Sequence, residues 1–170
     1  MNLKSSLKFI LFPIVVVGLI VTIFVYIFTI REPKVPATTQ LVQEVLATNE
    51  LPYAELTKEY QEKWNVDDML QNAISCEKSD LRFNFFVFDS EASAESIRKQ
   101  FQSYIRENRY SNPNIEISEG VKNYMLYSIK AAGMYTVNMR VENTLVFAYC
   151  DEENADNLNK IMIGIGYFEE

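Results

Sequence analysis

The chain has 170 residues and a net charge of −7 at neutral pH, and it contains two cysteines, five glycines and no histidine. Without histidine, Ser-His-Asp triads, Cys-His dyads and most zinc sites are excluded. The acidic charge disfavours nucleic acid as a partner, and no glycine-rich phosphate-binding motif occurs, so we expect no cofactor.

The run from Phe9 to Ile30, FILFPIVVVGLIVTIFVYIFTI, has 22 residues and no charge. As a helix it would span about 33 Å, enough to cross a bilayer core of about 30 Å. It is longer than the apolar region of a cleaved signal peptide, about 7–15 residues, and no small-residue cleavage site follows. We therefore expect a transmembrane helix over 9–30 after a tail of residues 1–8, with the membrane as one partner.

Charges on either side of this run indicate its orientation. Lys4 and Lys8 precede it, whereas Arg31 and Lys34 follow it, so the basic residues nearly balance. All 23 acidic residues follow the run, together with 13 of the 16 basic ones from Glu32 onward, which gives that segment a net charge of −10. This arrangement is typical of a single-pass protein of the cell membrane, with a cytoplasmic N-terminus and an extracytoplasmic C-terminal domain.

The segment after the run predicts a short stalk and one folded domain. Pro33 and Pro36 favour extended backbone, which indicates a stiff stalk over 31–37. Residues 38–170 contain enough apolar and aromatic residues for a single core. Apolar residues at helical spacing, such as Tyr60 and Trp64, predict two or three short helices within 38–75.

A change to period-two alternation then predicts a sheet. Residues 81–88 alternate as a strand, with Phe83 and Phe85 among those facing the core. The next expected elements are a helix over 93–107, a polar loop over 108–120, strands over 123–130, 134–142 and 145–150, and a helix over 153–163. If the helix over 93–107 is a right-handed crossover, strands 81–88 and 123–130 run parallel. The order predicts an α+β fold with a mostly antiparallel four-stranded sheet, β-α-β-β-β-α.

The stretch from about Arg82 to Tyr167 resembles small membrane-anchored proteins of unknown function from Gram-positive bacteria. The motifs that carry the resemblance are FNFFVF, the helix start at Ala92-Ser93-Ala94, the segment GMYTV from Gly133, the segment RVENTLV from Arg140, and Gly166-Tyr167. The resemblance covers about half of the chain and implies a habitat, but no activity and no site residues.

Acidic residues cluster between Asp151 and Asn157, in the segment DEENADN. A helix-loop-helix calcium loop requires an acidic or amide residue at position 5 and glycine at position 6, where this chain has Ala155 and Asp156. We therefore favour a helix start whose acids oppose the helix dipole. A pair of carboxylates that meet only in space stays open, because such pairs leave no mark in the sequence.

Cys76 and Cys150 have two interpretations. An even cysteine count in an extracellular domain suggests a disulfide. The predicted topology instead places the two residues at opposite ends of the sheet, beyond the Cα separation of about 7 Å that a disulfide permits. Two separate buried thiols are the alternative, and the sequence does not decide between them.

The second face of the sheet supplies the candidate site. Phe86 and Phe88 point away from the core face, and we expect Val146 and Ala148 on the same side. Either the helices of 38–75 cover this face, or it forms an exposed apolar patch edged by polar residues that binds a partner. The candidate partner-binding residues are Phe86, Phe88, Asn138 and Arg140.

Two functional classes remain from the sequence. We expect a non-catalytic, extracytoplasmic binding module of unknown specificity, whose partner is an envelope component or a membrane protein. The alternative is an envelope-associated enzyme that uses carboxylates or a thiol. No catalytic, cofactor-binding or metal-binding residue is assigned, and a cleft with paired acids would favour the enzyme.

Overall fold

The computed structural model describes residues 32–66, 68–108, 115–121 and 123–169. The chain divides into two compact units, Met1–Pro33 and Lys34–Glu170, and the second holds all the elements below. In chain order they are α2 (Thr39–Thr48), β1 (Tyr53–Glu55), α3 (Thr57–Trp64), β2 (Leu70–Lys78), β3 (Leu81–Phe88), α4 (Glu91–Asn108), β4 (Ile115–Val121), β5 (Tyr124–Ala131), β6 (Met134–Val141), β7 (Thr144–Asp151), the 3-10 helix η1 (Glu152–Asn154) and α5 (Ala155–Gly164).

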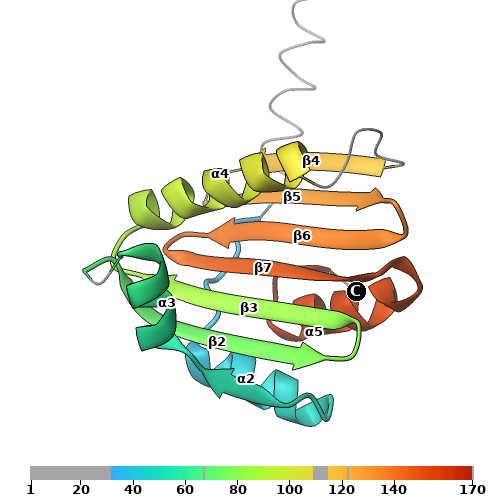
Figure 1. Cartoon of the computed structure of the whole chain (residues 1–170), viewed down its shortest axis with the longest axis horizontal. Coiled ribbons are helices and arrows are strands. Elements are labelled where there is room, and N and C mark those ends of the chain that lie inside the picture. The colour runs from blue at the N-terminus through green and yellow to red at the C-terminus, as the bar shows by residue number, and fades with distance from the viewer. Residues whose placement is uncertain (1–31, 67, 109–114, 122, 170) are drawn as a thin grey trace, which may run out of the picture. The chain divides into compact units, whose positions relative to one another are not determined.

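One seven-stranded sheet organises this unit, in the order β1-β2-β3-β7-β6-β5-β4 (Figure 1). Every neighbouring pair of strands is antiparallel. The predicted α+β class is confirmed. The predicted four-stranded sheet is wrong, because β1, β2 and β4 were not recognised as strands.

The missed strands have different causes. Strand β2 was predicted as a helix because its apolar residues occur at helical spacing, but Ala73 packs on one face of the sheet and Ile74 on the other. A strand buried on both faces loses its period-two signal. Strand β4 was predicted as loop because it is polar and lies at the sheet edge, where Ile115 and Ile117 are exposed.

The position of β4 also changes the expected topology. Helix α4 connects β3 to β4 and not to β5, so one strand that was not predicted lies between α4 and the run 123–130. Strand β7 lies between β3 and β6, and the alternation of directions makes β3 and β5 antiparallel. The predicted parallel relation between 81–88 and 123–130 is therefore wrong. The predicted hairpin at Gly133 is found, with φ of 52° at Ala132 and 77° at Gly133, as a type I′ turn requires.

Helices α2 and α5 cover one face of the sheet and close the larger core. Phe83 and Phe85 of β3 lie at its centre and are fully buried. Val42 and Leu46 of α2 pack against this face. Residues contributed by α5 and the C-terminal segment are Leu158, Ile161, Met162, Ile165 and Tyr167.

The second half of the predicted stalk belongs to this unit. The backbone N–H of Ala37 donates to the Tyr167 hydroxyl at 3.1 Å. The Lys34 N–H donates to Asn123 Oδ1 at 3.1 Å, and Asn123 Nδ2 donates to the Lys34 carbonyl at 2.7 Å. Residues 34–37 are thus fixed to the domain by hydrogen bonds.

Helices α3 and α4 cover the opposite face of the sheet. A buried network of charges attaches α4 to β6. Glu95 accepts from Arg98 Nε at 2.7 Å and from Arg140 Nε at 3.1 Å, and Arg140 also donates to Glu91 at 2.6 Å. Asn138 of β6 donates to the Arg98 carbonyl at 2.8 Å. The first turns of α4 are therefore bound to the sheet by polar contacts as well as by packing.

The described helices bear on the predicted membrane anchor. In residues 32–66, 68–108, 115–121 and 123–169, no helix has the length and apolar character needed to cross a membrane. This finding overturns the predicted single-pass architecture and the membrane localisation drawn from it. The run 9–30, on which both predictions rested, lies outside the described residues, as does the tail 1–8.

Phe85→Ala tests the position of the core. We expect the free energy of unfolding to fall by about 3–5 kcal/mol, because the ring is fully buried and its loss leaves a cavity. Val35→Ala is the control, since Val35 is 79% exposed and its loss should change stability by less than about 0.5 kcal/mol. Urea denaturation of Lys34–Glu170 measures both, and equal losses in the two variants would contradict the assigned core.

Acidification tests the charge network. Hydrogen bonds from Arg98 lower the pKa of Glu95 below its ordinary value of 4.5. The stabilisation is therefore complete above pH 4.5 and is lost as the pH falls through the folded-state pKa. We expect Glu95→Gln to lower the free energy of unfolding at neutral pH and to make that free energy less dependent on pH in the acidic range. Urea denaturation at a series of pH values measures the effect, and Glu44→Gln is the control because Glu44 is exposed. If the free energy of unfolding depends on pH in Glu95→Gln as it does in the wild type, the assigned role of Glu95 is contradicted.

Candidate functional site

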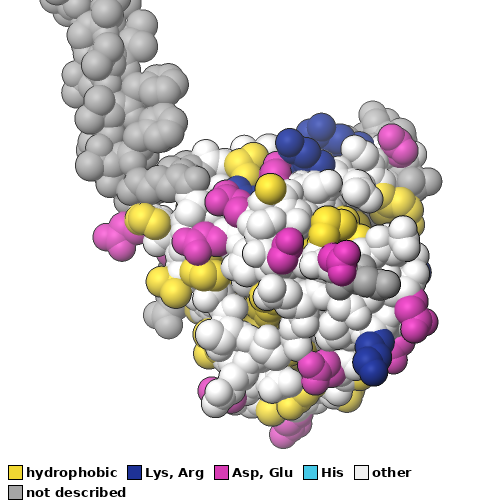
Figure 2. All heavy atoms as spheres, turned by 90° about the vertical axis from the view of Figure 1, so that its left-hand side faces the viewer, with side chains coloured by type: hydrophobic (Ala, Val, Ile, Leu, Met, Phe, Trp, Pro, Cys, Tyr) yellow, Lys and Arg dark blue, Asp and Glu magenta, His cyan; other side chains and the backbone are white. Residues whose placement is uncertain are grey.

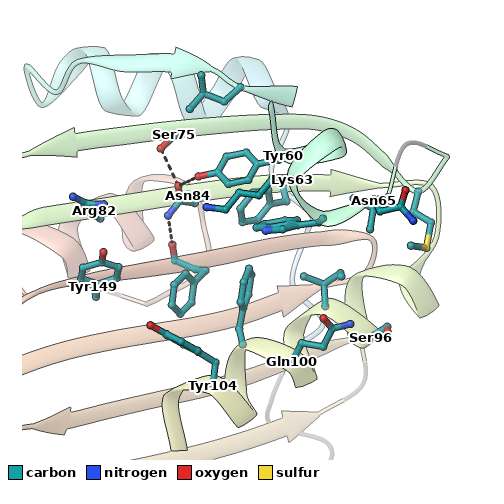
Figure 3. A pocket seen from close by; sticks show the side chains of 18 of the residues that line it. Tyr60, Lys63, Asn65, Ser75, Arg82, Asn84, Ser96, Gln100, Tyr104 and Tyr149 are labelled. Carbon is teal, nitrogen blue, oxygen red and sulfur yellow. Dashed lines mark hydrogen bonds between the residues drawn. The ribbon is translucent and has the colours of Figure 1, made fainter. Parts of the chain in front are cut away.

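A groove between α3 and α4 is the candidate functional site (Figure 3). Its floor is formed by β2, β3 and β7, and its volume is about 820 Å³. The residues that line it include Tyr60, Lys63, Trp64, Ser75, Glu77, Arg82, Asn84, Phe86, Phe101, Phe147 and Tyr149.

The floor of the groove changes from polar to apolar along β3. Alternate residues of this strand point to the same face, and their side chains become steadily less exposed. The Arg82 side chain is 50% exposed, whereas the exposed fraction is 9% at Asn84 and 1% at Phe86. The two ends of the groove therefore have different chemistry.

Aromatic rings form both walls of the apolar part. Trp64 of α3 lies 4.7 Å from Tyr60 and 5.1 Å from Phe86, measured between ring centroids. Phe101 of α4 lies 5.5 Å from Trp64 and stacks on Phe147 of β7 at 4.5 Å. These tilted, edge-to-face and stacked contacts fix the rings in place, so the walls are formed before any ligand binds.

Asn84 is the polar centre of the floor. Its Oδ1 accepts from the Tyr60 hydroxyl at 2.8 Å and from Ser75 Oγ at 2.9 Å. Its Nδ2 donates to the Phe147 carbonyl at 3.2 Å. Burial raises the pKa of the Tyr60 phenol, so this hydroxyl stays protonated and keeps donating at neutral pH. Helix α3 is thereby held to the sheet at one fixed point.

The charges of the groove differ from those of the chain as a whole. In the view of Figure 2, acidic side chains are scattered over the face, and basic ones occur at fewer places. Among the residues described as lining the groove, Glu77 is the only carboxylate, and Arg82 and Lys63 are the two cations. Glu77 pairs with Arg82. The groove is therefore mildly basic on an acidic protein.

The structure places the four predicted partner-binding residues on one face, as expected, and buries them all. Exposed fractions are 1% for Phe86, zero for Phe88 and Asn138, and 5% for Arg140. Within the segment 38–75, α3 covers this face, and Val66 and Leu70 pack in the same cluster. Helix α4 provides the rest of the cover. Only Phe86 lines the groove. Their role in binding a partner stays a prediction.

Two residues expected on that face lie on the other. Val146 and Ala148 belong to the core under α2 and α5, because they pair directly with Phe85 and Phe83, and paired residues share a face. Leu145 and Phe147 take their place beside Phe86 and α4. The strand was predicted correctly, but its register was wrong by one residue.

Sequence reasoning did not bring together the residues of the groove. Tyr60 and Trp64 carried a signal, since they lie four apart on one stripe of a predicted helix. Asn84 also carried one, as a polar residue within the aromatic strand FNFFVF. Phe101 lies within the helix predicted over 93–107, and nothing in the sequence indicated that α3 lies opposite it.

The two cysteines are free and buried. Cys76 lies on β2 and Cys150 on β7, with β3 between them, so two strand spacings of about 4.8 Å separate their backbones. The disulfide is therefore absent. Burial raises the pKa of both thiols, to about 11 for Cys150, where Asp80 and Asp151 add to the effect.

The acidic run starts a helix and does not form a calcium loop. Glu152–Asn154 form η1 and Ala155–Gly164 form α5, with Asp156 in the first turn. The structure shows no side-chain capping bond at Asn154, so the acids act through the helix dipole. Within the described ranges, no group of three or more Cys, Asp or Glu side chains is placed to hold a metal ion.

Comparisons with known proteins give two distant structural likenesses. No family model and no curated sequence matches the chain. A GTP-binding regulator from Thermotoga maritima is 14% identical, with a TM-score of 0.46 over 78% of this chain and 90% of the other. A structure described as the putative lipoprotein LppA from Mycobacterium tuberculosis is 12% identical, with a TM-score of 0.21 over 76% and 78%. These scores are too low to support an argument about function, and the resemblance to Gram-positive proteins stays untested.

Thiol labelling tests the placement of the cysteines. We expect an aromatic disulfide reagent to react slowly with the native protein and to modify both thiols after unfolding, because only the exposed thiolate reacts. Absorbance of the released thiol measures the reaction without prior reduction. Failure of both thiols to react in denaturant would instead indicate a disulfide.

Proposed function

We propose that this domain is a non-catalytic binding module and that the groove between α3 and α4 is its ligand site. One observation carries the proposal: aromatic walls held by mutual contacts surround a fixed polar centre at Asn84. Sites for small molecules are typically clefts of about 300–1,000 Å³, mostly apolar, with a few convergent polar groups. The groove has this size, and its lining combines aromatic rings with polar side chains in similar measure.

The chemistry of the groove supports binding over catalysis. Its single carboxylate, Glu77, is paired with Arg82, so the described lining lacks a second acid for acid–base work. Cys76 is part of the lining, but it packs in the opposite core together with Cys150, and burial raises the pKa of both thiols and keeps them protonated at neutral pH. The carboxylate or thiol enzyme considered from the sequence has no specific observation in its favour.

A small molecule suits the structure better than a protein partner at the predicted patch. Phe88, Asn138 and Arg140 are buried under α4, and exposing them would require breaking the contacts of Glu95. The groove is already formed and needs no such rearrangement. Its rings match a ligand with an aromatic or alkyl body.

Binding of N-phenyl-1-naphthylamine, a neutral fluorescent probe, tests the proposal. Trp64 is the single tryptophan of the chain and lines the groove, so bound probe should quench its fluorescence. We expect Phe101→Gln to weaken binding by about tenfold, since it replaces an aromatic wall by a polar side chain. Tyr53→Gln is the matched control, because Tyr53 is an exposed aromatic residue outside the groove.

Two results would contradict this assignment. The first is probe binding that is unchanged in Phe101→Gln, which would place the site elsewhere. The second is the absence of Trp64 quenching at any probe concentration. Near-ultraviolet circular dichroism of each variant verifies that the native packing is kept.

A further inference from the structure

We propose that the ligand of this groove is an anionic single-chain amphiphile, a free fatty acid, with its carboxylate at the Arg82 end and its chain against the half-buried aromatic rings. This inference rests on the proposed function and adds the chemical class and the direction of the ligand. Three features of the site support it: the gradient of polarity along the floor, the balance of charges, and the hydrogen-bonding state of Asn84.

The gradient of polarity gives the direction. Arg82 and Asn84 form the polar end, next to Tyr149, which pairs with Arg82 across β3 and β7. At the other end, Phe86 lies under Trp64 and Phe101. In Figure 3, Arg82 and Tyr149 lie at one end of the groove, whereas the polar side chains toward the other end, Ser96 and Gln100, come from α4 and not from the floor. A ligand with one polar and one apolar end matches the floor in only one direction.

The balance of charges gives the sign of the head group. Lys63 forms no salt bridge with any described residue, and in Figure 3 its side chain extends from α3 toward the polar end. Arg82 pairs with Glu77, but both side chains are at least half exposed, and such pairs rearrange at little cost. An anion therefore finds one cation without a salt bridge to any described residue and one exchangeable cation here, on a protein whose net charge is negative.

The hydrogen bonds of Asn84 favour an acceptor. Its Oδ1 already accepts two bonds, from Tyr60 and Ser75, which fills both lone pairs. Its Nδ2 carries two hydrogens, of which one goes to the Phe147 carbonyl. The second hydrogen can donate to a ligand oxygen, and a carboxylate provides one without bringing a competing donor.

Three ligands with the same alkyl chain separate head-group recognition from chain binding. Laurate is anionic, dodecanol is neutral and dodecylammonium is cationic, and each is titrated as monomer against the full chain while Trp64 fluorescence is followed. We expect laurate to bind most tightly and dodecylammonium most weakly. Added salt should weaken laurate binding and leave dodecanol binding unchanged, because salt screens exposed charges.

Variants of the three charged residues test the contacts in opposite directions. The double variant Lys63→Gln, Arg82→Gln should bind laurate about fivefold to tenfold more weakly, with dodecanol unaffected. Glu77→Gln should bind laurate about twofold to fivefold more tightly, because it frees Arg82, and a damaged fold cannot produce such a gain. Lys58→Gln is the control, since Lys58 is an exposed lysine of the same helix outside the groove.

The outcomes distinguish this inference from the function on which it rests. Equal affinities for laurate and dodecanol, or unchanged laurate binding in the double variant, would overturn the anionic head group and leave groove binding intact. Binding of N-phenyl-1-naphthylamine without binding of laurate would also overturn it. If neither the probe nor any of the three amphiphiles binds, both proposals fail.

Discussion

Glu95 holds two arginines at once, and the geometry of the second helical layer depends on this shared contact. Arg98 comes from the same helix and Arg140 from β6, so one carboxylate joins α4 to the middle of the sheet. Both guanidinium groups are almost fully buried, and buried charges are costly unless each is paired. A displaced α4 would keep its internal pair of Arg98 and Glu95 but would leave the buried Arg140 without Glu95 and Glu91. The helix is therefore confined to one position, and with it one wall of the groove.

The sequence predicted those elements whose signal is local. The strand 81–88, the helix around 93–107 and the hairpin at Gly133 were found because alternation, amphipathic spacing and turn residues act over a few positions. Strand β2 was missed because it is buried on both faces, and β4 because an edge strand need not be apolar. Both errors shortened the predicted sheet, and the omission of β4 also reversed the expected direction of 123–130.

The site was less accessible to prediction than the fold. Its walls come from α3 and α4, which are separated in the chain by two strands of the floor, and no pattern within either helix specifies the other. Asn84 illustrates the difficulty: as a letter in FNFFVF it is an interruption of an apolar strand. In the structure it joins β2, β7 and α3 through Ser75, Phe147 and Tyr60. Its importance arises from neighbours that only the tertiary fold provides.

The hydrogen bond between Ala37 and Tyr167 has a mechanical consequence. It connects the residue at which the chain enters the domain to a residue near the domain's end, and Tyr167 also shares a hydrogen bond with Thr144 of β7. Tension applied from the N-terminal side would first load the contacts of Lys34 with Asn123, and would then reach β7 and the C-terminal segment through Ala37 before it reached α2. The force would be distributed over the centre of the sheet, so the domain would resist mechanical unfolding from its N-terminal end.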